Sequence, residues 1–263
     1  MGLASALGRR GIADVTVVPI QRTDWLQVLR GVLDWGFLRG EAQPDGPAFN
    51  WYLRAARASV EQAVAQRQQA LQAAGGSFGS MPPTSSDARV VLVGHSAGGW
   101  LARALCLDEA WARQYVRAIV SLGAPHLGPP PDVPDQTRGT VASLNVRAPG
   151  AFLRRSASLV YVTVASGRIV GDAAAPPGSA ARTAYNSYQM VCGEGDVPGD
   201  GIVPLNSAHL DGATQLTLDC FHSIAEPGTA RPTDEWYAAE PVIDQWLSTV
   251  AAELRKQRFG LAG

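Results

Sequence analysis

The sequence predicts an α/β fold in which a mostly parallel sheet carries helices on both faces. Short β-branched runs alternate with longer amphipathic segments, which is typical of crossover connections between parallel strands. The central run, Val90–Val93, is uninterrupted and apolar, as expected of a strand that is buried on both faces. Hydrophobic residues make up 46% of the 263 residues and charged ones 17%, so a single α/β domain over residues 1–263 is expected.

The elements before the central strand follow from local patterns. Leu3 and Leu7 lie on one face of a helix that ends at Gly11, so residues 1–11 are expected to be the end of a helix. The β-branched run 14–20 predicts a strand, and the mixture of Gly, Pro and aromatic residues makes 21–50 irregular. Apolar residues at helical spacing predict a helix over 51–74, followed by a loop rich in Gly, Ser and Pro at 75–88.

The later elements repeat the strand-and-helix alternation. Apolar runs predict a helix at 101–107, strands at 116–122, 159–165 and 215–219, and a closing helix at 236–255. Two long excursions, 129–157 and 166–213, separate the later strands. The segment 129–157 is expected to form a lid or a pocket wall, because loops on this edge of a parallel sheet carry function.

The composition excludes several classes of protein. A formal net charge of −1 offers no bulk attraction to nucleic acid or to an anionic membrane. No apolar stretch approaches the roughly 20 residues that span a bilayer, and the first residues lack both the apolar core of a secretory signal and the myristoylation pattern. These features predict a soluble intracellular protein. The odd number of cysteines favours reduced thiols, with a Cys192–Cys220 bond near the candidate site as the alternative.

The segment Gly94-His95-Ser96-Ala97-Gly98 lies between the buried strand and a helix. A strand that turns at once into a helix strains the residue at the bend, and Gly94 and Gly98 are expected to relieve the crowding. Ser96 is then exposed above the sheet, and the backbone N–H of Ala97 is aimed at the same spot, ready for an oxyanion. A chance G-x-S-x-G in a structural turn is the alternative, which the strand-to-helix placement disfavours.

A nucleophilic serine needs a base within hydrogen-bond reach, and four histidines compete for that role. His222 follows strand 215–219 at the carboxyl edge, where functional loops gather, and is the preferred base. His209 precedes that strand and is expected towards the opposite end or on the way to it. His95 lies within the bend and is expected to point away from Ser96. His126 and Leu127 follow strand 116–122 at the correct edge; with His95 they are candidates for the pocket wall, although a structural role for His126 is an equal alternative.

The acid that orients the base is expected between strand 159–165 and His222, where the candidates are Glu194, Asp196, Asp200 and Asp211. Asp200 lies between two glycines in Gly199–Pro204, a setting for a tight loop that projects one carboxylate. It precedes His222 by 222 − 200 = 22 residues, which is enough for one connecting element and one strand. The alternatives are a plain Asp-Gly turn, or Glu194 or Asp196 as the acid.

Several stretches together resemble the α/β-hydrolase superfamily, and within it lipase-like proteins of plants, algae and cyanobacteria, several of them chloroplast-associated. The resemblance rests on Val18-Pro-Ile20 with Asp24-Trp-Leu26, Gly94–Gly98, Leu122-Gly-Ala-Pro-His126, Asp135-Gln-Thr-Arg-Gly139, Val191-Cys-Gly-Glu194, Gly199–Pro204, Ala208-His-Leu210 and His222-Ser223. It implies Ser96, Asp200 and His222 as a catalytic triad, hydrolysis of an ester or a lipid, and a plastid or cytoplasmic location.

The expected reaction is therefore cleavage of a small-molecule or lipid ester through an acyl-enzyme. The alternatives are acyl transfer on the same triad, or a catalytically weak protein that only binds its ligand. No metal or organic cofactor is expected, because no spacing of His, Cys or Glu suggests one. The sequence predicts no particular oligomeric state.

One family element has no counterpart in the chain. In the family, a strand before the first helix carries the loop that donates the second oxyanion N–H, whereas this chain starts within that helix. The strand at 14–20 is then expected to close against the central strand, to become a sheet edge, or to borrow a partner. The sequence accordingly predicts an N-terminally incomplete hydrolase, less stable and less active than a version extended by about 30–50 residues.

Overall fold

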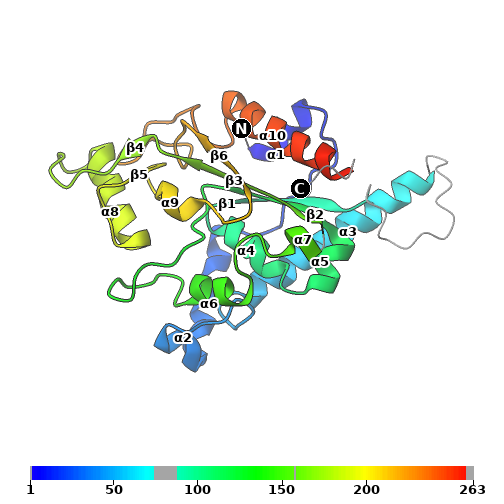
Figure 1. Ribbon diagram of the computed structural model, residues 1–263, viewed down its shortest axis with the longest axis horizontal. Coiled ribbons are helices and arrows are strands. Elements are labelled where there is room, and N and C mark those ends of the chain that lie inside the picture. The colour runs from blue at the N-terminus through cyan, green and yellow to red at the C-terminus, as the bar shows by residue number, and fades with distance from the viewer. Residues whose placement is uncertain (1, 74–87, 157, 259–263) are drawn as a thin grey trace.

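The computed structural model describes residues 2–73, 88–156 and 158–258. Four parallel strands form the main sheet in the order β1-β2-β3-β6, with bounds Val90–His95, Val116–Leu122, Val160–Ser166 and Thr214–Leu218. Helices lie on both faces of this sheet (Figure 1). The predicted α/β fold with a mostly parallel sheet is confirmed.

The two faces of the sheet carry separate hydrophobic cores. One core contains residues of α1 (Leu3–Arg9) and α10 (Glu240–Arg258), which lie together on one side of the sheet in Figure 1. The other contains residues of α3 (Asn50–Ala73), α4 (Ala97–Leu105), α5 (Glu109–Tyr115), α6 (Thr140–Arg147) and α7 (Leu153–Ser156). Helices α3, α4 and α10 match predicted helices, whereas α5 was not predicted.

The excursion 166–213 forms a smaller unit at the carboxyl edge of the sheet. Strand β4 (Ile169–Val170) pairs with β5 (Pro198–Gly199) in an antiparallel ribbon, and α8 (Ala180–Cys192) packs against β4. The short helix α9 (Leu205–Ala208) follows and contacts β3. This unit delivers the candidate acid to the end of the sheet that carries the strand-to-helix bend.

Helices α6 and α7 of the excursion 129–157 pack against the rest of the domain. Val141 and Leu144 of α6 and Leu153 of α7 are 1%, 0% and 0% exposed, and they belong to the same core cluster as α3 and α4. The described part of this excursion therefore packs as a wall against the domain.

The strand predicted at 14–20 is not formed. Residues 12–21 have no regular secondary structure, although Val15 and Val18 pack against the two different cores. The segment predicted to be irregular, 21–50, instead contains the 3₁₀ helix η1 (Arg22–Leu33) and helix α2 (Trp35–Arg39). Side-chain caps explain where these two helices begin. Gln21 and Asp24 form a capping box at the start of η1, and Asp34 accepts from the Gly36 N–H at the start of α2.

Strand β1 lies at an edge of the sheet, so the predicted burial of Val90–Val93 on both faces is wrong. Among the described residues β1 pairs with β2 alone, and Val91 is 36% exposed. Every residue of β3, by contrast, is buried. Within the described ranges, no helix is long and apolar enough to cross a bilayer.

Candidate active site

The candidate nucleophile lies at the bend between β1 and α4. Ser96 has φ 54° and ψ −130°, a backbone conformation that residues other than glycine rarely adopt. Its N–H donates to the Leu122 carbonyl at 3.0 Å, which ties the bend to the end of β2. Such strain at one serine on the carboxyl edge of a parallel sheet is the geometry expected of a nucleophile elbow.

The glycines that permit this bend are not quite those predicted. A Cβ on Gly94 would lie 2.3 Å from the Gly98 carbonyl oxygen, so this position has no room for a side chain. A Cβ on Gly98 would meet nothing closer than the Tyr52 hydroxyl at 3.8 Å, so its expected role in relieving crowding is wrong. Gly99 fills that role, because a Cβ there would lie 2.4 Å from the Ala124 Cβ.

The candidate acid and base lie in direct contact. Nδ1 of His222 donates to Oδ2 of Asp200 at 2.8 Å, and the His222 backbone N–H donates to the Asp200 carbonyl at 2.9 Å. Both residues are buried, with exposed fractions of 7% and 1%. Because a carboxylate only accepts, this contact places the imidazole proton on Nδ1 and leaves Nε2 free to accept a proton. Glu194, Asp196 and Asp211 are exposed and make no hydrogen bond with His222.

The loop that carries Asp200 depends on its two glycines. A Cβ on Gly199 would lie 2.5 Å from the Val203 carbonyl oxygen, and one on Gly201 would lie 2.3 Å from Cγ of Pro227. Gly201 also has φ +101°, which favours glycine. The hydroxyl of Tyr188 on α8 accepts from the Gly201 N–H at 2.8 Å and donates to the Ile169 carbonyl at 3.1 Å, so α8 holds the loop in place.

Tyr237 and Gly123 complete the surroundings of the carboxylate. The Tyr237 hydroxyl donates to Oδ2 of Asp200 at 3.0 Å, and burial followed by the Asp200 charge raises the pKa of Tyr237 well above its usual value. A Cβ on Gly123 would lie 2.6 Å from both Oδ2 of Asp200 and Cε2 of Tyr237, so the glycine after β2 gives these groups room. The sequence offered no spacing that would have singled out Tyr237.

His95 packs against the candidate base. Its ring centroid lies 4.6 Å from that of His222, and its Nε2–H donates to the His222 backbone carbonyl at 2.8 Å. Burial, and then the proximity of His222, lowers the pKa of His95 to about 4, so its ring is neutral above that pH. His95, the last residue of β1, therefore binds the backbone of His222 and packs against its ring, a role that the sequence did not predict.

Two hydrogen bonds that the predicted chemistry requires are not formed among the described residues of this structure. The Ser96 hydroxyl makes no hydrogen bond with His222 or any other residue within the described ranges. The N–H of Ala97, the first of α4, likewise has no acceptor among the described residues. Free donors at the start of a helix suit an oxyanion, and catalytic hydrogen bonds are often long before substrate binds.

The remaining predicted residues lie outside this contact network. His126 is 1% exposed, its Nε2 lies 2.9 Å from the Ser121 hydroxyl, and burial lowers its pKa well below the usual value, so it is a structural histidine. Leu127 is exposed. His209 links β3 to β6 through the hydroxyls of Thr163 and Thr217 at 3.1 and 3.0 Å.

The cysteines and the acidic residues define no further centre. All three cysteines are free thiols: Cys106 and Cys220 are buried, and Cys192 is half-buried. In the described ranges, no three residues among His, Cys, Asp and Glu are grouped so that they could hold a metal ion.

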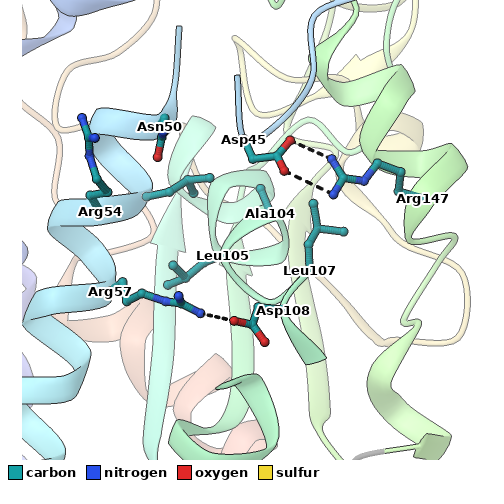
Figure 2. A pocket seen from close by; sticks show the side chains of 10 residues that line it. Asp45, Asn50, Arg54, Arg57, Ala104, Leu105, Leu107, Asp108 and Arg147 are labelled. Atoms are coloured by element: carbon teal, nitrogen blue, oxygen red, sulfur yellow. Dashed lines mark hydrogen bonds and ion pairs between the residues drawn. The ribbon is translucent and has the colours of Figure 1, made fainter. Parts of the chain in front are cut away.

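A cavity of about 330 Å³ is lined by the last residues of α4 and by residues of α3 (Figure 2). Its walls carry two ion pairs, Arg57 with Asp108 and Arg147 with Asp45. Leu105, the last residue of α4, lines it, whereas Ser96 precedes the first. The nine residues of α4 span about 13 Å, so this cavity is separate from the candidate active site.

The comparison with protein families agrees with the fold class. Residues 60–166 match the family described as the PGAP1-like alpha/beta domain, a range that includes Ser96 but neither Asp200 nor His222. No curated protein matches the chain. One similar solved structure is the mature form of the lipase BlEst2 from Bacillus licheniformis, at 16% identity over 71% of this chain and 70% of that chain, with a TM-score of 0.36. A likeness this distant says nothing about the site or the substrate.

The parallel sheet and the strand-to-helix bend at Ser96 agree with an α/β-hydrolase fold, to which the family match over residues 60–166 also points. The resemblance seen in the sequence is confirmed at this level. The narrower subgroup of plant, algal and cyanobacterial proteins, and the chloroplast association that goes with it, stay predictions.

Proposed function

We propose that this chain cleaves carboxylic esters, including esters of lipids, with Ser96 as nucleophile, His222 as base and Asp200 as the acid that orients the base. The observation that carries the proposal is the buried contact of 2.8 Å between His222 and Asp200, next to a serine in a strained bend. A buried carboxylate aimed at the imidazole N–H, with the other nitrogen left free, is the arrangement that general-base catalysis requires.

The reaction would proceed in two stages. Nε2 of His222 takes the Ser96 proton while the serine oxygen attacks the ester carbonyl, and the resulting oxyanion accepts from the Ala97 N–H. The imidazolium then gives its proton to the departing alcohol, which leaves an acyl group on Ser96. Water, deprotonated by His222, attacks this acyl-enzyme and releases the carboxylic acid, while Asp200 supports the imidazolium in both stages.

The direct test is covalent labelling of the serine. The purified chain is treated with a fluorophosphonate probe, and the adduct is located by mass spectrometry of peptides. We expect one adduct on Ser96, and no adduct on the folded Ser96→Ala variant. The same variant should lose activity on a panel of simple and lipid esters by at least about 10⁴-fold, with its melting temperature nearly unchanged, because triad members act as a unit.

One observation favours a second candidate, a protein of this fold that binds its ligand without turnover. The Ser96 hydroxyl is not hydrogen-bonded to His222 among the described residues, and Ala97 supplies a single oxyanion donor. Loss of one such donor costs about 10²–10³ in turnover. A folded chain that takes up no label at Ser96 would contradict the first candidate and favour the second.

A further inference from the structure

Tyr237 is a fully buried residue that the proposed chemistry does not use, yet its hydroxyl touches the acid. It donates to Oδ2 of Asp200 at 3.0 Å, and this same oxygen accepts from Nδ1 of His222 at 2.8 Å. Tyr237 is itself fixed, because Nε1 of Trp246 on α10 donates to its carbonyl at 2.9 Å. The preceding Trp236 forms a parallel bridge with Phe221, next to His222.

We propose that Tyr237 is a positioning residue, whose hydroxyl draws charge away from Asp200 and so keeps His222 in its neutral, proton-accepting form. The inference rests on the proposed function. Two donors share Oδ2, and each reduces the negative charge that the other experiences. A carboxylate that accepts both donors stabilises the imidazolium of His222 less than an unshared carboxylate would.

The other carboxylate oxygen fixes the geometry without help from Tyr237. Oδ1 of Asp200 accepts from the backbone N–H groups of Ile202 at 3.0 Å and Val203 at 2.7 Å. These bonds hold the plane of the carboxylate, so removal of the tyrosine hydroxyl should change the charge on Oδ2 more than its position. The role of Tyr237 can therefore be measured apart from simple misplacement of the acid.

The groups that face the pair from neighbouring elements are neutral near neutral pH. His95 on β1 has its pKa lowered to about 4, and Cys220, which precedes the base, has its pKa raised to about 12, both mainly by burial. Burial also raises the pKa of Tyr188 on α8 and of Tyr237. Among the charged groups on neighbouring segments, Arg168 is paired with Asp219 at 3.3 Å and with Glu235 at 2.6 Å. The acid limb of the pH profile is the range in which the rate of Ser96 labelling falls as the pH is lowered. It should thus report protonation of the His222–Asp200 pair.

The substitution Tyr237→Phe removes the hydroxyl and leaves the ring. The unshared carboxylate then stabilises the imidazolium more, so a higher pH is needed to free the base. We expect the acid limb to move up by about one pH unit, which corresponds to about a tenfold change in proton affinity. The rate on the alkaline plateau should stay within about threefold of wild type, because the geometry is retained.

The measurement is the rate of Ser96 labelling by a fluorophosphonate probe between pH 5 and pH 9, which needs no knowledge of the natural ester. Tyr161→Phe is the matched control, because Tyr161 is also buried, at 2% exposed, but belongs to the core on the other face of the sheet. The control should superimpose on wild type. Difluorotyrosine at position 237, a stronger donor of the same shape, should move the acid limb to lower pH and covers the case in which Tyr237→Phe fails to fold.

The outcomes separate this inference from the proposed function. If wild-type Ser96 takes up no label, both fall. If Ser96 is labelled but the acid limb of Tyr237→Phe coincides with that of wild type, Tyr237 has a packing role alone. The inference is then overturned, while the proposed triad is unaffected. Where Tyr237→Phe does not fold, the acid limb of the difluorotyrosine variant is judged in the same way. A lower plateau with an unmoved limb has the same meaning, because lost packing slows the reaction at every pH.

Discussion

Asp200 differs from the other carboxylates of its excursion in the number of hydrogen bonds that it accepts. Two backbone N–H groups bind one oxygen, and His222 and Tyr237 bind the other. A buried charge is tolerable only when it is satisfied in this way. Glu194 and Asp196, the alternatives that the sequence left open, are exposed and lack such partners.

This difference predicts how the acids respond to substitution. Asp200→Asn should lower ester turnover by about 10⁴-fold, because the amide no longer holds the imidazole in the required tautomer. Asp196→Asn and Glu194→Gln are matched controls on the same loop and should stay within about threefold of wild type. Steady-state kinetics on a simple ester would measure these losses of turnover. A loss in Asp196→Asn as large as that in Asp200→Asn would contradict the assignment of Asp200 as the acid.

His95 predicts a pH dependence of stability. Its pKa of about 4 in the folded chain lies below the usual 6.5, so the folded state resists protonation that the unfolded state accepts. The free energy of unfolding should therefore be fully present above pH 6.5 and fall as the pH drops through 4. The contribution of His95 to this loss is on the order of 3 kcal/mol.

The variant His95→Gln tests this dependence, because glutamine keeps a donor and cannot titrate. Urea unfolding between pH 7 and pH 4 should show a shallower loss of stability for the variant than for wild type. Parallel curves would mean that His95 is not buried beside His222 as described.

At the scale of elements, the bend between β1 and α4 depends on close packing as much as on strain. Gly94 approaches the backbone of α4, and Gly99 approaches Ala124 after β2. Gly98 lies in the first turn of the helix, where a Cβ would meet the Tyr52 hydroxyl at an ordinary contact distance of 3.8 Å. The motif alone cannot separate these three glycines, because the contacts that distinguish them come from the backbone of α4, from α3 and from the end of β2.

The bend therefore predicts opposite effects for adjacent substitutions. Gly99→Ala should destabilise the protein by about 1–3 kcal/mol through overpacking against Ala124. Gly98→Ala should be neutral or stabilise it by up to about 1 kcal/mol, since alanine favours the helix. Thermal unfolding of both variants gives the comparison, and a larger loss for Gly98→Ala would contradict the geometry of the bend.

At the scale of the whole molecule, β1 forms one edge of the main sheet, with β2 as its neighbour among the described residues. Roughly half of the amides of an edge strand point away from its one partner and have no strand to bind. Hydrogen exchange should therefore be faster in peptides that cover Val90–His95 than in those that cover Val116–Leu122. Equal protection of the two strands would indicate that another segment, such as 14–20, pairs with β1 in solution.

The sequence predicts the positions of the strands of the main sheet well. Strands β2, β3 and β6 lie within a residue or so of the predicted ranges, because long β-branched runs leave little ambiguity. The run 14–20 has the same character but forms no strand, since a strand also needs a partner and propensity does not supply one. Ser96, Asp200 and His222 could be chosen from position and turn chemistry, whereas Tyr237 and His95 are placed by tertiary packing that no local pattern encodes.

The central claim, that Ser96, His222 and Asp200 act as one unit, is tested most directly by a double-mutant cycle on the rate of Ser96 labelling. Wild type, Asp200→Asn, His222→Gln and the double variant are compared with one fluorophosphonate probe at one pH. If Asp200 acts through His222, the double variant should label no more slowly than His222→Gln alone, a strongly non-additive result. Losses that simply multiply would show that the two residues act independently, and would contradict the triad.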